Sequence, residues 1–213
     1  QEQGGFFGRS YMLGDDSIEG YIPGKKETLE ERTIREVDGI VKLLNPSPQA
    51  LILDVPCGYG RHTIELQKRG YITSGVDINE KFLGVAKKNA MKLFGSKPKW
   101  WQPNFETGDM RTLMLAKENI KIKNRYQCLI NMFYSFGFFS EEDNIATMQS
   151  FYDALNGNRC GKMLIHTDVS PEMILEGKDY RLNERRNLRN GGQLQIDESY
   201  DAKTKRVNGS WTI

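Results

Sequence analysis

The most constraining feature of the sequence is a regular alternation of short apolar runs with longer amphipathic segments between about residues 28 and 166. The run 51–55 is β-rich and lies between Pro48 and Pro56, which is typical of a strand buried on both faces. Further strands are expected at 71–77, 104–107, 126–130 and 163–166. Strands that alternate with helices imply right-handed βαβ crossovers, so the sequence predicts an α/β fold with a doubly wound, mostly parallel sheet flanked by helices.

Four helices are expected between these strands. Their starts carry capping residues: Thr28 with Glu31 in a capping box, then Asn79 and Ser140. Gly70 ends the helix expected at about 63–69. The apolar stripes expected to face the core are Ile34, Val37, Val41 and Leu44 in the first helix, Phe82, Leu83, Ala86, Ala90 and Leu93 in the third, and Ile145, Met148, Tyr152 and Leu155 in the fourth.

The pattern changes after His166. Residues 170–187 are predicted to form a helix whose basic face carries Lys178, Arg181, Arg185 and Arg189. From Gly192 onward apolar and polar residues alternate around a turn near 201–205, which predicts a C-terminal antiparallel β hairpin or a partial β insertion. Because the sequence stops inside an apparent strand at 211–213, we expect the chain to be truncated there.

Composition excludes several classes of protein. The 213 residues carry 30 basic and 28 acidic side chains spread along the chain, so nucleic acid is not expected as a partner. Three widely spaced cysteines form neither a disulfide framework nor a metal site, and a cytoplasmic location is expected. No apolar run approaches the roughly 18 residues of a membrane span, so no membrane partner is expected either.

The turn after the first strand is the expected ligand site. Asp54 ends that strand, and Gly58 and Gly60 follow, where backbone can approach a ligand closely. Two unit charges about 4 Å apart interact by roughly 4 kcal/mol at an effective dielectric near 20, so Asp54 disfavours a pyrophosphate and favours an ammonium. S-adenosylmethionine carries an α-amino group and no phosphate.

Two further strand ends carry carboxylates. Asp77 lies where an acidic side chain accepts hydrogen bonds from ribose hydroxyls, and Ile78 beside it can cover an adenine ring. Asp109 can accept from the adenine amino group, and Met110 can pack on the ring. Carboxylates at three successive strand ends therefore fit one nucleoside with an amino-acid tail.

At this point the sequence resembles the class I S-adenosylmethionine-dependent methyltransferases, whose core is a Rossmann-like sheet. The stretch LDVPCGYGRHTIEL is similar to their first motif, and the segment 76–78 is similar to their second. The segment 108–111 is similar to the one that holds adenine, and 126–139 resembles the fourth-strand segment of a small-molecule branch. The stretch 155–165 matches the entry to the fifth strand. Gln127 stands where the family usually has Asp, and the 156–161 turn is two residues longer.

Roles are also expected for further residues. Cys57 would line the cofactor turn, Asn131 would contact the methionine end of the cofactor, and Tyr11 would belong to a lid over it. Phe133, Tyr134 and Asp168 would contact the methyl acceptor. His166 is the candidate base, against the alternative of a structural histidine, and no metal ion is expected.

The function expected from the resemblance is transfer of a methyl group from S-adenosylmethionine to an N or O atom of a small molecule, by in-line displacement. An RNA or protein methyltransferase and a non-catalytic cofactor-binding module are the alternatives. The expected organisation is an N-terminal lid segment and helix (1–45), a cofactor-binding core (46–168), and a C-terminal part that covers the active site (169–213). The sequence sets neither the acceptor nor the oligomeric state.

Overall fold

The structure is a computed structural model that describes residues 27–115, 120–157, 160–167, 181–188 and 191–212. The chain divides into two compact units. One unit is Thr33–Thr167, and the other combines Gln1–Arg32 with Asp168–Ile213. We describe each unit by itself.

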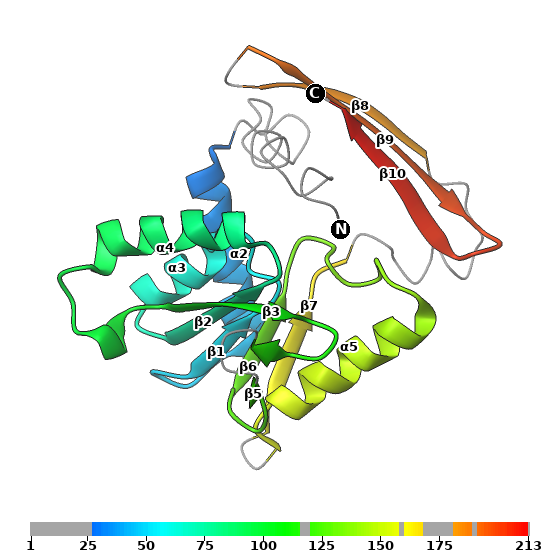
Figure 1. Ribbon diagram of the computed structural model, residues 1–213. Coiled ribbons are helices and arrows are strands. Elements are labelled where there is room, and N and C mark those ends of the chain that lie inside the picture. Colours follow the sequence, from blue (N-terminus) through cyan, green and yellow to red (C-terminus); the bar gives the residue numbers. More distant parts are fainter. Residues whose placement is uncertain (1–26, 116–119, 158–159, 168–180, 189–190, 213) are drawn as a thin grey trace. The chain divides into compact units, whose positions relative to one another are not determined.

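The larger unit is built on a seven-stranded sheet in the order β5-β4-β3-β2-β1-β6-β7 (Figure 1). Its strands are β1 (Leu51–Asp54), β2 (Ile72–Asp77), β3 (Asn104–Asp109), β4 (Met114–Leu115), β5 (Ile120–Lys121), β6 (Cys128–Asn131) and β7 (Lys162–Ile165). Strands β3, β2, β1, β6 and β7 are parallel to one another, and β4 pairs antiparallel with both β3 and β5. This confirms the predicted doubly wound sheet. The sequence pattern did not reveal β4 and β5, because strands of two residues carry no measurable periodicity.

Helices cover both faces of this sheet (Figure 1). They are α2 (Leu29–Leu44), α3 (Arg61–Lys68), α4 (Glu80–Phe94) and α5 (Glu141–Ala154), with a short 3-10 helix η1 (Lys99–Trp101) before β3. Side chains of α2 and α3 pack with Ile52 and Ile130, whereas α5 packs with Leu53 and Leu129. Because neighbouring residues of a strand point to opposite faces, α5 lies on the other side of the sheet from α2 and α3. No helix in the described part of the chain is long and apolar enough to cross a bilayer.

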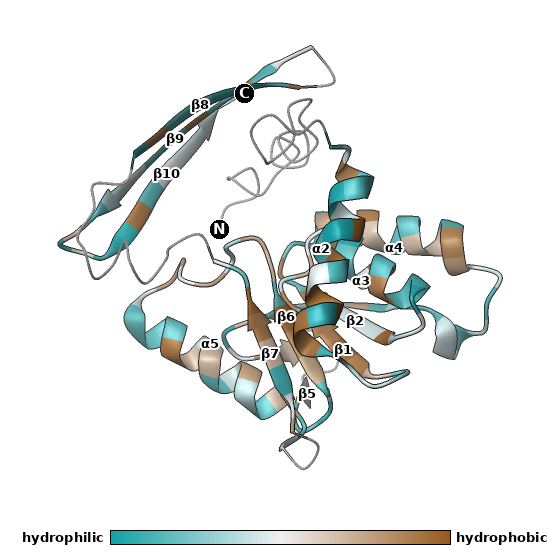
Figure 2. Ribbon diagram, turned by 180° about the vertical axis from the view of Figure 1, so that it is seen from behind, coloured by the Kyte–Doolittle hydropathy of each residue, from teal (hydrophilic) through white to brown (hydrophobic). Residues whose placement is uncertain are grey.

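The central strands are hydrophobic because both of their faces are covered, and Figure 2 shows this in the brown of β1 and β6. Ile52, Leu53, Leu129 and Ile130 are all fully buried. Gln127 immediately precedes β6, and its amide oxygen accepts from the backbone N–H of Leu51 at 3.2 Å. The departure from the family motif at Gln127 is therefore at the amino end of the strand, away from the carboxyl edge where ligands bind.

The predicted helix caps are confirmed. The Thr28 backbone N–H donates to Glu31 Oε2 at 2.8 Å, and the Glu31 backbone N–H donates to Thr28 Oγ1 at 3.2 Å. The Asn79 side chain accepts from the backbone N–H groups of Lys81 and Phe82, and that of Ser140 accepts from Asp143.

Some of the predicted helix faces are wrong. Ile34, Leu93, Ile145 and Tyr152 are exposed rather than buried. In α5 the inner face consists of Thr147, Ser150, Phe151 and Ala154. The two hydroxyls are satisfied locally, because Thr147 Oγ1 donates to the Asp143 carbonyl and Ser150 Oγ to the Met110 carbonyl. Small hydroxyl side chains with such partners are buried at little cost in free energy. The pattern of apolar residues alone therefore predicts the wrong buried face for α5.

In the second unit the described C-terminal residues form a three-stranded antiparallel sheet in the order β10-β9-β8. Its strands are β8 (Arg181–Asn187), β9 (Gln193–Asp201) and β10 (Arg206–Thr212). The predicted β hairpin is confirmed, but the prediction of a helix through 187 is wrong for 181–187. Exposed residues there alternate with more buried ones, and each residue pairs with β9. Lys178 and Arg189 lie outside the described residues.

Candidate functional site

The chain reverses direction across the sheet between β1 and β6, and ligands of doubly wound sheets bind at the carboxyl ends of the strands on either side of such a reversal. Asp54 ends β1 and Asn131 ends β6. These strands are hydrogen-bonded neighbours, with Asp54 paired to Ile130. Asp54 and Asn131 therefore flank the position where a ligand is expected.

Asp54 is buried at the start of this site, with a side chain 1% exposed. Its Oδ2 accepts from Thr63 Oγ1 at 2.6 Å, while its Oδ1 has no hydrogen-bond partner among the described residues. Burial raises the pKa of the carboxyl to about 7, against the opposing effects of the Thr63 hydrogen bond and the Arg61 charge. A buried carboxylate oxygen without a partner can still accept a hydrogen bond from a cationic donor.

Both glycines of the turn after β1 have left-handed backbone conformations. Gly58 and Gly60 have positive φ angles of 54° and 79°. A Cβ on Gly60 would lie 2.7 Å from the Phe105 ring and 2.9 Å from Ala86, whereas a Cβ on Gly58 would meet nothing within 4 Å. Gly60 is therefore required by packing, and Gly58 borders open space.

Cys57 lies in the same turn and packs into the core. Its backbone N–H donates to the Val76 carbonyl, and burial raises the pKa of its thiol well above the ordinary range. A Cβ on Gly75 would lie 2.7 Å from the Cys57 sulfur. Cys57 is thus a small packing residue rather than a reactive thiolate.

Asp77 fixes the turn to the end of β2. Its Oδ2 accepts from the Gly58 backbone N–H at 2.7 Å, and its Oδ1 accepts from the Asn79 backbone N–H at 2.8 Å. Burial raises the pKa of this carboxyl against the effect of these backbone donors. Each oxygen keeps a further lone pair, as the predicted ribose contact requires. Ile78, next to it, is 58% exposed, so its alkyl surface is available to a ligand.

Asp109 ends β3 and forms an ion pair with Arg111, which the sequence pattern does not predict. Arg111 Nη2 donates to Asp109 Oδ2 at 2.6 Å, Arg111 Nε contacts both carboxylate oxygens, and the Arg111 backbone N–H donates to Oδ1 at 2.9 Å. Although partial burial opposes it, this pairing lowers the pKa of Asp109. A ligand amino group would have to share Asp109 with Arg111, and Met110 between them lies half-buried against the core.

Asn131 is fully buried at the end of β6. Its Nδ2 donates to the Val55 carbonyl at 2.8 Å, while its Oδ1 has no hydrogen-bond partner among the described residues. The site thus holds two buried, unpartnered oxygens, one from Asp54 and one from Asn131. Asp54 is paired with Ile130 and contacts Thr63 on α3, whereas Asn131 is the next residue of β6 and points to the other face of the sheet, so the two oxygens do not form a pair. An ammonium has three donors and no acceptor, and the Asp54 oxygen is the one whose charge favours it.

An aromatic cluster follows β6. Phe133 and Tyr134 both have positive φ angles, of 59° and 57°. Their loop is held against β7 because the Tyr134 backbone N–H donates to the His166 carbonyl at 3.1 Å, and the His166 N–H to the Asn131 carbonyl at 2.9 Å. The rings of Tyr134 and His166 are 4.7 Å apart between centroids, and those of Phe133 and His166 are 5.9 Å apart. The structure therefore brings these three predicted residues together beside the site.

Three further residues belong to this neighbourhood and were missed from the sequence. Glu36 on α2 pairs with Arg61 and lies 2.9 Å from His62 Nε2. Burial opposes the shift, but His62 and Arg61 lower the pKa of Glu36 to about 2. The Arg61 guanidinium lies 4.4 Å above the Phe133 ring. The contact joins α2, α3 and the loop after β6, and no local spacing could have revealed it.

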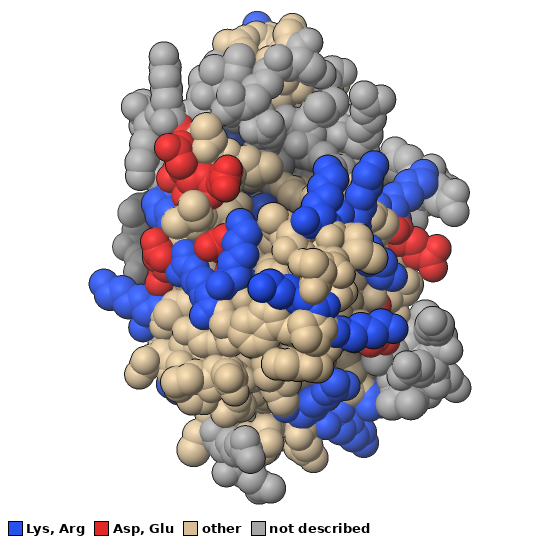
Figure 3. All heavy atoms as spheres, turned by 90° about the vertical axis from the view of Figure 1, so that its left-hand side faces the viewer, with Lys and Arg blue, Asp and Glu red and all other residues tan. Residues whose placement is uncertain are grey.

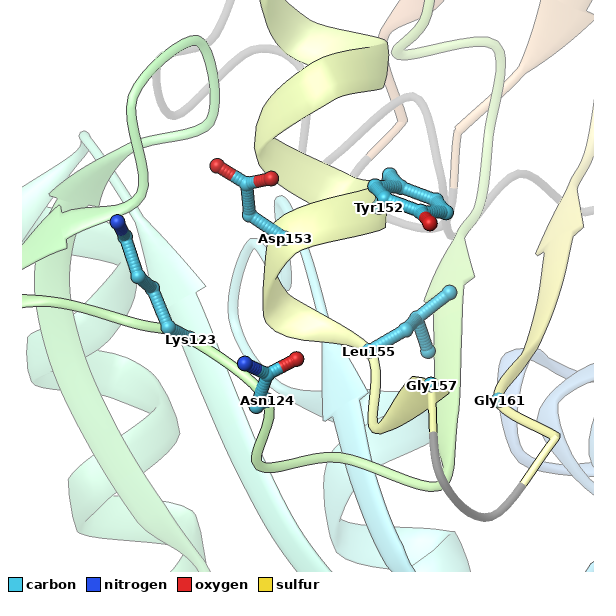
Figure 4. A pocket seen from close by; sticks show the side chains of 7 residues that line it. All are labelled: Lys123, Asn124, Tyr152, Asp153, Leu155, Gly157 and Gly161. Atoms are coloured by element: carbon cyan, nitrogen blue, oxygen red, sulfur yellow. The ribbon is translucent and has the colours of Figure 1, made fainter.

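Two predicted site residues, Tyr11 and Asp168, lie outside the described residues. A pocket elsewhere in the unit contains none of the predicted site residues (Figure 4). It is lined by Lys123, Asn124, Tyr152, Asp153, Leu155, Gly157 and Gly161. These residues precede β6 and β7, so the pocket is at the amino edge of the sheet, opposite the strand ends described above.

Comparison with known proteins agrees with this geometry. Residues 52–158 match the family model described as methyltransferase domain. The structure is similar to that of the CcbJ methyltransferase from Streptomyces caelestis, with 15% identity, a TM-score of 0.62, and coverage of 84% of this chain and 65% of that one. It is also similar to CalS10 from Micromonospora echinaspora, an amino pentose methyltransferase solved with SAM bound, with 18% identity, a TM-score of 0.51, and coverage of 87% and 76%. No match is found among curated proteins.

The fold and the site define a Rossmann-like protein whose polar side chains gather at the carboxyl ends of its parallel strands. The matched region covers half of the sequence, and the chain belongs to the methyltransferase domain family. This confirms the predicted family and, with it, S-adenosylmethionine as the cofactor. The chain spans 60% of the length of a TehB-like SAM-dependent methyltransferase from Corynebacterium glutamicum (62% of this chain, 20% identity, TM-score 0.46).

Proposed function

We propose that this chain transfers a methyl group from S-adenosylmethionine to an N or O atom of a small molecule by in-line displacement. The observation that carries the proposal is the buried Asp54 oxygen at the reversal point of the sheet, which has no partner among the described residues. It supplies an acceptor for an amino-acid ammonium, and the rest of the site extends from it toward β2 and β3.

The chain's own residues would bind and orient the cofactor, which when bound supplies an electrophilic methyl on a sulfonium. Asp54 would hold its ammonium, Asn131 would contact its methionine end, and Asp77 would hold its ribose hydroxyls. Ile78 and Met110 would contact the adenine, with Asp109 accepting from the adenine amino group in competition with Arg111. Correct alignment of two reactants is worth about 7–11 kcal/mol, so positioning can supply most of the catalysis.

The acceptor would lie against Phe133 and Tyr134, beside the methionine end of the cofactor. Their strained backbone fits a functional loop, because such conformations persist where the surroundings fix them. An amine acceptor needs only to be neutral, whereas a hydroxyl acceptor needs a base. His166, which packs on both rings, is our candidate for that base.

Three observations support a small acceptor. The overall charge is near neutral, the chain lacks the N-P-P-Y segment used to hold a flipped adenine, and it lacks a P-C nucleophile loop after the fourth parallel strand. CalS10, to which 87% of this chain is similar in fold, is an amino pentose methyltransferase. The alternatives are RNA or protein methylation, or cofactor binding without turnover. The cytoplasmic location stays a prediction.

The test is a turnover screen of amines and phenols with S-adenosylmethionine, following release of S-adenosylhomocysteine. We expect at least one small acceptor to be methylated, and Phe133→Ala to raise its KM more than it changes cofactor affinity. Tyr152→Ala, an exposed aromatic on α5, is the matched control and should leave turnover unchanged. Cofactor binding without turnover on any small acceptor, RNA or protein would favour the non-catalytic alternative.

A further inference from the structure

One exposed surface of the larger unit is unusual in both charge and side-chain type. It comprises α4, the turn that follows it, and η1, and we name it the lysine–tryptophan surface. Between Lys81 and Phe105 the sequence has six lysines and no acidic residue. The whole chain has 30 basic and 28 acidic residues, so without these six lysines it would carry an excess of four acidic ones. This segment therefore carries a net charge of +6 in a chain whose formal net charge is +2.

The six lysines, Lys81, Lys87, Lys88, Lys92, Lys97 and Lys99, are all exposed. In the part of the chain that the structure describes, none of them has an ion-pair partner. Lys68 and Arg69 at the end of α3 differ, because they pair with Glu65 and Asp38. Figure 3, which views the molecule from the left-hand side of Figure 1, shows blue side chains around a broad tan area, with red mainly toward the upper and side margins.

Large apolar side chains lie among these charges. Trp100 is 72% exposed, Met91 65% and Leu93 51%. The segment is nevertheless ordered by internal contacts: the Gly95 N–H donates to the Met91 carbonyl, and the Lys97 N–H to the Phe94 carbonyl. Gln67 Nε2 donates to the Trp101 carbonyl at 3.1 Å, which fixes η1 to α3 while the Trp100 side chain is exposed. An exposed Trp on a fixed backbone is a built surface feature rather than the result of a loose loop.

We propose that the lysine–tryptophan surface binds the anionic surface of a lipid bilayer. Lysines near an anionic leaflet attract it, and Trp with aliphatic side chains inserts at the headgroup level. A nucleic acid fits less well, because all six cations are lysines and none is the arginine that pairs phosphate in a bidentate manner. A second copy of this surface fits less well still, since six unpaired lysines on each partner would repel. The absence of a spanning helix concerns integral membrane proteins and not this peripheral mode.

Co-sedimentation of the full chain with vesicles tests the proposal. We expect binding to phosphatidylcholine vesicles that contain phosphatidylserine, at least tenfold weaker binding to phosphatidylcholine alone, and weakening by added salt. The double variant K97E/K99E should bind the anionic vesicles at least tenfold more weakly. The matched control is K203E/K205E, two exposed lysines in the turn between β9 and β10, which should bind as the original chain does.

A second measurement tests the apolar part. Acyl-chain-brominated lipids should quench the chain's tryptophan fluorescence, and Trp100→Phe should remove most of this quenching while Trp101 and Trp211 remain. All variants should keep the unfolding midpoint and the S-adenosylhomocysteine affinity of the original chain, because the surface includes no residue of the cofactor site. Equal binding to anionic and neutral vesicles, or binding unaffected by K97E/K99E, would overturn the proposal. So would binding of a single-stranded RNA, but not of vesicles, that K97E/K99E abolishes.

Discussion

Asp54 is the residue at which folding and ligand binding conflict most. The chain buries its carboxyl with one hydrogen bond and leaves one oxygen without a partner, and the pKa rises to about 7. Burial of a charge that lacks a full set of partners disfavours the folded state. A bound cation at this strand end would give the unpartnered oxygen a partner and so offset this loss of stability.

The first prediction concerns pH. The unfolded carboxyl titrates near 3.8 and the folded one near 7, so the folded chain binds the proton more tightly between these values. Protonation of Asp54 therefore contributes to the free energy of unfolding. This contribution is fully present below about pH 4 and is lost as pH rises through 7, and its upper bound is about 4 kcal/mol. Asp54→Asn does not titrate. Urea unfolding at pH 5 and pH 8 should show that Asp54→Asn is more stable relative to the original chain at pH 8 than at pH 5. The same difference in free energy of unfolding at both pH values would contradict this prediction.

The second prediction separates the two glycines of the turn. Gly60→Ala combines a positive φ with a clash against Phe105, so it should lower the free energy of unfolding by about 3 kcal/mol or more. Gly58→Ala meets open space and should cost only about 1–2 kcal/mol. Because that open space is where we place the cofactor, Gly58→Ala should still weaken S-adenosylhomocysteine binding. Denaturant unfolding measures the stability of the two variants, and calorimetry measures their affinity for S-adenosylhomocysteine. Equal free energies of unfolding for Gly58→Ala and Gly60→Ala would show that the turn rearranges.

For helices and strands, a feature could be predicted from the sequence when residues close to it in the chain determine it. The caps of Thr28, Asn79 and Ser140 are set by neighbours within three residues, and the sequence predicts them correctly. The face of α5 depends on what lies beneath it, and the apolar pattern there selected Ile145 and Tyr152 wrongly. The spacing of the arginines in 181–189 favours a helix, whereas the alternation of exposed and more buried residues in β8 is set by its pairing with β9.

The third prediction tests the corrected face of α5. Phe151 is fully buried among Leu53, Leu129 and their neighbours, so Phe151→Ala should lower the free energy of unfolding by about 3–5 kcal/mol. Tyr152, its neighbour on the helix, is 74% exposed, and Tyr152→Ala should change it by about 0.5 kcal/mol or less. Urea unfolding of both variants measures the contrast. A larger loss for Tyr152→Ala than for Phe151→Ala would mean that the predicted stripe, and not the described one, faces the core.

At the scale of the whole molecule, the sheet order follows from the alternation of strands and helices, and the reversal between β1 and β6 locates the site. The acidic strand ends were therefore predictable. The contact of Glu36 with Arg61 and His62, and the engagement of Asp109 by Arg111, were not, because both depend on side-chain geometry that spacing does not encode. The strand-end site and the lysine–tryptophan surface share no residues, so each can be tested without disturbing the other.

The most direct test of the central claim is calorimetric titration of the chain with S-adenosylhomocysteine, which carries the ammonium, ribose and adenine without a transferable methyl. We predict binding at micromolar concentrations, weakened at least tenfold by Asp77→Ala, a loss of about 1.4 kcal/mol or more. Asp38→Ala, which removes an exposed carboxylate paired with Arg69, should leave the affinity unchanged. No heat of binding to the folded original chain, or equal losses in the two variants, would contradict a cofactor site at the strand ends.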